Sequence, residues 1–288
     1  MENILELQQV SKTFPKSDFA LENVTFSLPY GAIMGFVGEN GAGKTTTIGC
    51  ILNTVTKDSG TIKLFGKEMS DADTDMREKI GVVYDGDNFP AYWSAMQLSE
   101  VMEGLYTQWD KALFQKYLED FQLPAKQKIK HYSRGMTMKL AIAAALAHHP
   151  QLLLLDEATS GLDPVMRDEM LDVFLEFMQA ENHSILLSSH ITSDLEKVAD
   201  YITFIHKGRL IMTVSKNDLV YNYAVIRCRE SQFLALDPND VLAYRKRDFQ
   251  MDVLVPDGKA AQRKYRDLVI DHASIDEIML LLVKGERV

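Results

Sequence analysis

The chain has 288 residues, enough for one large domain or for a large and a small one. Hydrophobic residues make up 46% and charged residues 25%, which is typical of a globular protein and argues against a disordered or fibrous chain. The formal net charge of -10 disfavours nucleic acid as a partner, because proteins that grip a phosphodiester backbone normally present a basic face.

The sequence also argues against export and against membrane insertion. The N-terminal residues lack the basic segment and apolar run of a secretory signal. Cys50 and Cys228 lie far apart and form neither a zinc pattern nor a disulfide framework. The most apolar stretches, residues 140–147 and 152–155, are shorter than the ~20 residues of a spanning helix. We therefore expect a cytoplasmic protein.

Strand and helix patterns alternate along most of the chain. Strand-like patterns open it, and residues 32–37 form a short apolar run that ends in glycine before a helix-compatible segment. Helical patterns fill residues 88–150, and apolar strand candidates return at 152–155, 185–187 and 202–205. This alternation predicts an α/β fold whose parallel sheet is covered by helices on both faces.

A change of pattern near residue 214 predicts two parts. We expect a domain over residues 1–213, with a helical subdomain at about 88–150, and an accessory α+β region over residues 214–288. In that region residues 224–228 and 249–255 are strand-like, and Ser274 with Glu277 fits a capping box that opens a final helix. No chemistry is assigned to the accessory region.

Residues 38–45 match the phosphate-loop pattern G-x-x-x-x-G-K-[ST] between a strand and a helix. That context argues against a plain glycine-rich turn with a solvated lysine. Glycines let backbone N–H groups converge on a triphosphate, Lys44 supplies a cation for the β and γ phosphates, and the Thr45 hydroxyl suits Mg²⁺. We predict that ATP and Mg²⁺ bind here, with ATP held by Gly38, Glu39, Asn40, Gly41, Ala42, Gly43, Lys44, Thr45 and Thr46.

A second motif places two carboxylates at the end of an apolar strand. Residues 152–157 read LLLLDE, and open parallel sheets gather ligands at such strand ends. Asp156 is the predicted Mg²⁺ partner, and Glu157 is predicted to orient or deprotonate the attacking water. Strands commonly end in acidic turns, so this prediction depends on the phosphate loop upstream.

The motifs that follow resemble the ordered series of ABC ATPases over about residues 1–215. They are Tyr132 to Met136, then residues 152–157, 160–163 and 188–190. The resemblance implies an ABC-type core with an antiparallel β subdomain, and two subunits that dimerise head to tail around two ATP molecules. It implies a signature loop that contacts the partner's ATP and a loop between the two sites. The signature loop consists of Ser133, Arg134, Gly135 and Met136. The loop between the two sites consists of Ser160, Gly161, Leu162 and Asp163.

The resemblance also assigns two single residues. It implies that His190 holds the γ phosphate, so that His190, Lys44 and Glu157 form the catalytic set, and that Phe14 stacks on adenine. The alternatives are a solvated loop histidine and a core phenylalanine. The neighbouring pair His148-His149 is interpreted as the polar or cationic end of the signature helix, without chemistry.

The signature and the segment that corresponds to the family's glutamine loop both depart from the family pattern. The usual signature is L-S-G-G-Q, and here Arg134 replaces its first glycine, while Tyr132 and Met136 are also changed. Arg134 either adds positive charge near a phosphate of the partner's ATP or projects away from it. Asp85 stands where the family has glutamine, so it is either an Mg²⁺ ligand or a solvated loop aspartate.

Segment 109–141 is similar to the ATP-binding subunits of bacterial exporters for antimicrobial or cytolytic peptides. This likeness implies a transport motor on the inner face of the membrane, bound to an integral-membrane subunit and paired with itself or a paralogous ATPase. In such transporters a groove beside the helical subdomain receives a helix of the membrane subunit. The aromatic cluster Phe89, Pro90, Tyr92 and Trp93 suits that contact, although each ring has packing inside the subdomain as its alternative.

Two rival functions differ from this motor. A soluble ABC ATPase that acts on DNA or ribosomes typically has a coiled-coil insertion or two cassettes, and the sequence has neither a heptad run nor a second phosphate loop. A regulatory subunit that binds ATP without turnover would be favoured by the loss of Glu157, which is present. The sequence therefore favours a hydrolytic transport subunit.

Overall fold

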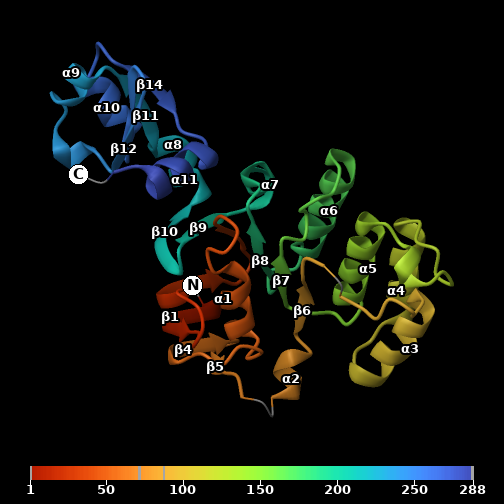
Figure 1. Cartoon of the computed structure of the whole chain (residues 1–288). Coiled ribbons are helices and arrows are strands. Elements are labelled where there is room, and N and C mark those ends of the chain that lie inside the picture. Colours follow the sequence, from red (N-terminus) through yellow and green to blue (C-terminus); the bar gives the residue numbers. More distant parts are fainter. Residues whose placement is uncertain (1, 71–72, 87, 287–288) are drawn as a thin grey trace.

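A computed structural model describes residues 2–70, 73–86 and 88–286 of the chain (Figure 1). Within these ranges one long sheet runs through the larger part of the molecule. In spatial order its strands are β5 (Lys67–Glu68), β4 (Ser59–Leu64), β1 (Asn3–Thr13), β2 (Ala20–Pro29), β10 (Arg209–Ser215), β9 (Tyr201–His206), β3 (Ile33–Val37), β8 (Ser184–Ser189), β7 (Leu152–Asp156) and β6 (Ile80–Val83).

The sheet has a parallel half and an antiparallel half. Strands β9, β3, β8, β7 and β6 pair in parallel, whereas β1, β2, β4 and β5 pair antiparallel. Strands β3, β7 and β8 are mostly apolar and buried at every position because both faces are covered, as the sequence pattern indicates. The predicted parallel sheet with an antiparallel β part is confirmed.

Strand β7 explains how a continuous apolar run serves both faces. Leu153 and Leu155 belong to one core cluster, together with Phe174 of α6 (Pro164–Phe177). Leu152 and Leu154 belong to the other, which includes residues of α1 (Lys44–Ile51). Successive side chains of a strand point to opposite faces, so every position of this run is buried.

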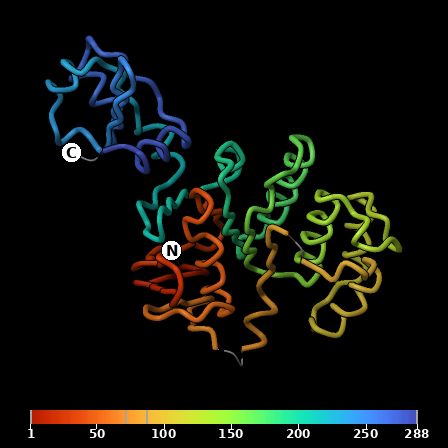
Figure 2. The backbone as a smooth tube through the Cα atoms, in the orientation of Figure 1, coloured from red at the N-terminus to blue at the C-terminus, as the bar shows by residue number. Residues whose placement is uncertain are grey.

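Helices gather beyond the β6 edge of the sheet, where Figure 2 shows residues of the helical subdomain in yellow and green. They are α3 (Ala95–Leu105), α4 (Lys111–Asp120), the short η1 (Ile129–His131) and α5 (Arg134–Leu146). A capping box of Ser94 and Gln97 opens α3, and the Asp110 side chain caps α4. The short α2 (Thr74–Arg77) precedes β6 in the chain.

Helix α5 packs closely against β6. A β carbon added at Gly81 of β6 would lie 2.8 Å from the carbonyl oxygen of Ala145 in α5, so only glycine allows this approach. The buried ring of His148 lies just after the end of α5. Its Nε2 atom is 3.2 Å from the carbonyl oxygen of Ile80, and Ile80 is the first residue of β6. Burial lowers the pKa of His148 below its ordinary 6.5, so His148 is the neutral, polar end of this helix.

The C-terminal region has its own sheet, in the order β12 (Ala243–Arg247), β13 (Gln250–Val255), β11 (Ala224–Cys228) and β14 (Val269–His272). Its helices are α8 (Lys216–Asn222), α9 (Glu230–Phe233), η2 (Pro238–Asp240), α10 (Gly258–Lys264) and α11 (Ile275–Lys284). The predicted capping box of Ser274 and Glu277 is confirmed at α11. The expected boundary at residue 214 falls inside β10, and the chain passes to the second sheet between Ser215 and Ala224.

The C-terminal region packs on α7 (Thr192–Val198) through α11. Ile275, Ile278 and Leu281 of α11 join the same core cluster as Leu195 of α7. The Ile275 amide also donates to Glu196 Oε1 at 3.2 Å. Over the residues that the structure describes, every helix is too short or too polar to cross a bilayer.

Candidate functional site

The chemistry-bearing loops follow the carboxyl ends of neighbouring parallel strands. The glycine-rich loop follows β3, Asp156 ends β7, His190 follows β8, and Asp85 lies two residues beyond β6. Parallel strands bring these ends to one edge of the sheet, where ligands of open α/β sheets bind. The sheet order therefore assembles residues that are far apart in the sequence.

The glycine-rich loop leads into the N-terminus of α1. Gly41 and Gly43 have φ values of +80° and +115°, a left-handed region that favours glycine, and Gly43 caps the helix. A β carbon at Gly38 would lie 2.5 Å from the Ile205 carbonyl oxygen. The loop thus fixes backbone N–H groups at a helix N-terminus, an arrangement that favours anions.

Lys44, Glu157 and His190 form one chain of contacts. Lys44 Nζ donates to the Gly38 carbonyl oxygen at 2.6 Å and lies 3.0 Å from Glu157 Oε1. The other oxygen of Glu157 lies 2.7 Å from His190 Nδ1. The Glu157 carboxylate therefore lies between a lysine and a histidine, two groups that also suit phosphate oxygens.

Asp156 accepts hydrogen bonds on both of its oxygens. The Thr45 hydroxyl donates to Oδ2 at 2.6 Å, and the Ser188 hydroxyl donates to Oδ1. Asp156 is buried, so these bonds fix its carboxylate beside the glycine-rich loop. A hydroxyl and a carboxylate side by side are the hard oxygen donors that Mg²⁺ prefers, so Thr45 and Asp156 fit this ion.

A hollow of about 530 Å³ lies between these groups. Its lining combines the glycine-rich loop with three carboxylates and two aromatic rings, namely Phe19, Asn40, Gly41, Gly43, Lys44, Thr45, Thr46, Tyr84, Asp85, Asp156 and Glu157. Its size is in the range of small-molecule sites. Phe14 packs beside this hollow against Phe19, with 6.3 Å between ring centroids, while Phe19 lines the hollow itself.

Comparison with known proteins agrees with this geometry. The model of the ABC transporter family matches residues 21–160. The chain is 32% identical over 213 residues to the bacitracin transport ATP-binding protein BcrA of Bacillus licheniformis, covering 73% of this chain and 69% of that protein. It is 35% identical over 214 residues to the lantibiotic transport ATP-binding protein SrtF of Streptococcus pyogenes, covering 73% and 90%. The chain belongs to the ABC transporter ATP-binding family.

Solved structures agree on the fold. The structure of an ATP-binding subunit of an ABC transporter superposes with a TM-score of 0.68 at 26% identity, covering 75% of this chain and 91% of that one. The dimeric ATP-binding cassette MJ0796, bound to ADP and Pi, gives a TM-score of 0.66 at 20% identity, covering 74% and 98%. As a member of this family the chain binds ATP and is an ATP hydrolase.

The ABC signature residues lie at the start of α5. Ser133 caps this helix, and its hydroxyl accepts from the Met136 amide at 3.2 Å. Gly135 lies against α6, where a β carbon would overlap the Met166 methyl group. Residues 133–136 are absent from the lining that the structure describes for the hollow of about 530 Å³, and their contact with a partner's ATP stays a prediction.

The predicted inter-site loop joins β7 to α6. The Ser160 amide donates to the Glu157 carbonyl oxygen at 2.9 Å, Leu162 is buried, and the Asp163 side chain caps α6. Gly161 has a φ of +70°. The loop is thereby joined to the backbone of Glu157 at one end and to α6 at the other.

The two departures from the ABC pattern contact each other. Arg134 Nη2 lies 2.7 Å from Asp85 Oδ1, so Arg134 points toward the loop after β6 in its own subunit. Asp85 is consequently paired and is not a lone solvated aspartate. Whether it also reaches Mg²⁺ stays a prediction.

Sequence reasoning missed the supporting residues of the ABC site. Ser188 was quoted only as part of a motif, yet its hydroxyl holds Asp156. His206 Nδ1 lies 2.8 Å from Glu39 of the phosphate loop, and Phe19 and Tyr84 line the hollow. The available signal for Ser188 was its position, one residue before the end of a mostly apolar strand. Nothing in the sequence pairs His206 with Glu39.

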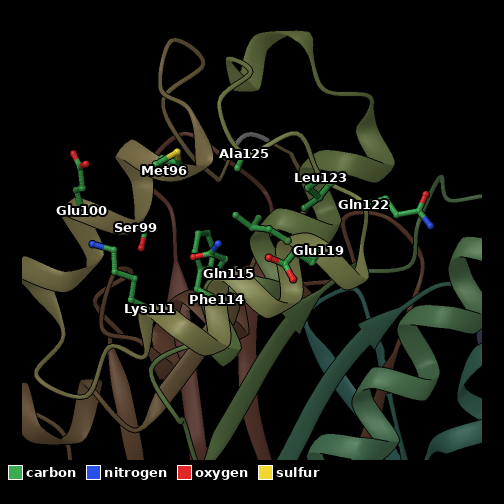
Figure 3. Close-up of a pocket in the computed structure, with 11 residues that line it drawn as sticks. Met96, Ser99, Glu100, Lys111, Phe114, Gln115, Glu119, Gln122, Leu123 and Ala125 are labelled. Atoms are coloured by element: carbon green, nitrogen blue, oxygen red, sulfur yellow. The ribbon is translucent and has the colours of Figure 1, made fainter.

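Two further hollows lie on the helical subdomain. One, of about 480 Å³, is lined by Asp85, Gly86, Phe89, Ala91, Ile129, Lys130, Tyr132, Arg134, Thr137 and Met138. The other, of about 290 Å³, lies between α3 and α4, with Phe114 and Leu123 inside and Glu100 and Lys111 at its rim (Figure 3). The first touches the signature and the loop after β6, while the second is remote from both.

Proposed function

We propose that the chain is the ATP-hydrolysing motor subunit of a membrane exporter for peptides, antibiotics or related amphipathic compounds. The observation that supports it best is the convergence of Lys44, Thr45, Asp156 and Glu157 on one hollow, with His190 in contact with Glu157. The likeness to transport subunits named for bacitracin and for a lantibiotic supports the class of cargo.

In the proposed reaction the glycine-rich loop and Lys44 hold the β and γ phosphates. His190 contacts the γ phosphate, and Glu157 accepts or orients a proton of the attacking water. Thr45 and Asp156 would hold Mg²⁺, which would neutralise charge on the phosphate oxygens. Lys44 contacts Glu157, so a phosphate that binds this lysine leaves the carboxylate for water.

ATP is proposed to close two copies around two nucleotides. The signature of one copy, Ser133 to Met136, then meets the phosphate held by the other, and residues 160–163 lie between the two sites. Closure by ATP and opening after hydrolysis give two states that the nucleotide selects, which is the source of motion. Pairing with a paralogous ATPase uses the same surfaces. Phe14 is proposed to stack on adenine beside Phe19.

The membrane subunit is proposed to dock at the hollow of about 480 Å³, which holds the chain on the inner face of the membrane. Phe89 and Tyr132 line this hollow, and the Tyr92 ring on the adjoining loop is 70% exposed. Lys130 lies over the Tyr92 ring at 4.9 Å. An exposed aromatic beside a hollow lined by both apolar and charged side chains suits an interface anchor.

The experiment is site-specific photo-crosslinking in membranes of the native host. A photoreactive phenylalanine analogue at Tyr92 is expected to link the chain to an integral-membrane protein, whereas the same analogue at Tyr221, which is 63% exposed on α8, is not. A host strain with Glu157→Gln in this chain is expected to become more sensitive to the exported peptide class. Crosslinks to ribosomal proteins instead would contradict the proposal.

A further inference from the structure

The guanidinium of Arg134 touches two loops of its own subunit. Its Nη2 atom lies 2.7 Å from Asp85 Oδ1, on the loop after β6. It also lies against Gly161 of the inter-site loop, where an added β carbon would be 2.5 Å from Arg134 Nη1. Arg134 itself is the first residue of α5, directly after the Ser133 cap. One side chain therefore contacts the loop after β6 and the inter-site loop at the start of the signature helix.

Two polar contacts join the ends of α5 to the ends of β6, and the Asp85–Arg134 pair is one of these two ties. At the far end His148 contacts the Ile80 carbonyl oxygen, where β6 begins. Between the two ties, Gly81 allows close packing against α5. Since β6 ends at Val83, Asp85 lies at its opposite end. The helix that presents the signature is thus fixed to this strand at both of its ends.

We infer that the Asp85–Arg134 pair positions the signature loop for the partner's ATP, and that Arg134 acts through Asp85 and is not a phosphate ligand. The inference rests on the proposed function. The family has neutral residues, glutamine and glycine, at these two positions, so the two departures compensate each other as an ion pair. Asp85 lines both the nucleotide hollow and the proposed docking hollow, which places the pair between ATP and the membrane subunit.

The expected effect of the pair is moderate. The side chains of Arg134 and Asp85 are 54% and 43% exposed, and exposed pairs of this kind change equilibria by about two- to fivefold. Without the pair the signature loop must become ordered each time two subunits close. This cost raises the ATP concentration that is needed for closure. Chemistry in the closed dimer uses other residues, so KM should rise while kcat stays nearly unchanged.

The first measurement is hydrogen exchange of the nucleotide-free full chain at the amides of Met136 and Thr137, which bond to Ser133. Arg134→Gln and Asp85→Asn should each speed exchange by about two- to fivefold. The reversed pair, Asp85→Arg with Arg134→Asp, should restore slow exchange. Lys246→Gln, which removes an exposed pair with Glu230 at 2.8 Å in the C-terminal region, is the control and should change nothing there.

The second measurement is ATP-driven dimerisation in a Glu157→Gln background, followed by light scattering. Each single variant should require about two- to fivefold more ATP, and the reversed pair should restore the requirement. Unchanged exchange, or an unchanged ATP requirement, in the single variants overturns the inference. A second pattern also overturns it: the reversed pair is as impaired as Arg134→Gln, and Asp85→Asn has no effect. Arg134 would then act on phosphate directly. Failure of Glu157→Gln alone to dimerise contradicts the proposed function, and the exchange experiment still decides on the pair.

Discussion

Glu157 occupies an unusual backbone conformation for the residue proposed to handle water. Its φ is +53°, in the left-handed region that residues other than glycine seldom adopt. Two contacts hold it there, since its amide donates to the carbonyl oxygen of Ser188 at 3.1 Å and lies 3.2 Å from the Ser188 hydroxyl. The same serine hydroxyl holds Asp156. Ser188 therefore links the Asp156 carboxylate to the Glu157 backbone. Such strained positions commonly occur at functional sites.

His148 gives a pH-dependent prediction at the same scale. Its pKa is lowered by burial, so the unfolded chain binds a proton more readily than the folded one. The contribution of His148 to stability is then complete above about pH 6.5 and is lost as pH falls, at up to about 1.4 kcal/mol per pH unit for one group. Between pH 7.5 and 5.5 the free energy of unfolding should therefore decrease less for His148→Gln than for the native chain, as measured by denaturant titration.

The exposed neighbour His149 supplies the control for that experiment. It has a φ of +54°, which asparagine tolerates, and it pairs with Asp110 at the surface. His149→Asn should keep most of the pH dependence of the native chain, because burial is the largest cause of the lowered His148 pKa and the charge of His149 only adds to it. Equal pH dependence in His148→Gln and in the native protein would contradict the role given to the buried ring.

At the scale of elements, strand order explains which site residues could be predicted. The phosphate loop and the Asp156-Glu157 pair each follow an apolar strand, so local sequence alone indicated that they end on one edge of a parallel sheet. The Asp85–Arg134 contact joins residues 49 positions apart on different elements, and no local pattern encodes it. Phe14 and Phe19 lie in one loop region, and only their packing distinguishes which ring faces the hollow. Local chemistry was therefore predictable, whereas contacts that depend on tertiary packing were not.

The packing of α11 on α7 predicts that the C-terminal region supports the catalytic part. Ile278 is fully buried in the core cluster that also includes Leu195. Ile278→Ala should lower the free energy of unfolding by about 2–4 kcal/mol, because it leaves a cavity in this shared core. The midpoint followed by fluorescence of Trp93 and Trp109, both in the helical subdomain, should shift with it. Leu282→Ala, at a partly buried position, should have a smaller effect.

Two kinds of signal would distinguish a shared core from separate domains. If Ile278→Ala produced an early transition in circular dichroism while the tryptophan midpoint stayed unchanged, the C-terminal region would unfold on its own. A common shift of both signals supports one cooperative unit, in which α7, just after His190, is braced by the accessory region.

For the whole molecule, one subunit supplies only half of each proposed site. The hollow beside β3 and β7 holds the phosphate loop, Asp156 and Glu157, whereas the signature at the start of α5 is absent from the described lining of that hollow. A second copy, or a paralogous subunit, is needed to bring a signature to the phosphates. Catalysis and subunit closure are therefore expected to depend on each other.

The most direct test compares ATP hydrolysis and ATP-driven dimerisation in the native chain and in Glu157→Gln, with Glu68→Gln on the edge strand β5 as control. The native chain and the control should release phosphate, and Glu157→Gln should lose about 10²- to 10⁴-fold in rate while it binds ATP and accumulates as a dimer. Lost hydrolysis with retained closure is the result that the account predicts. Equal hydrolysis by the native chain and Glu157→Gln would contradict it, because Glu157 would then not be the carboxylate that activates water.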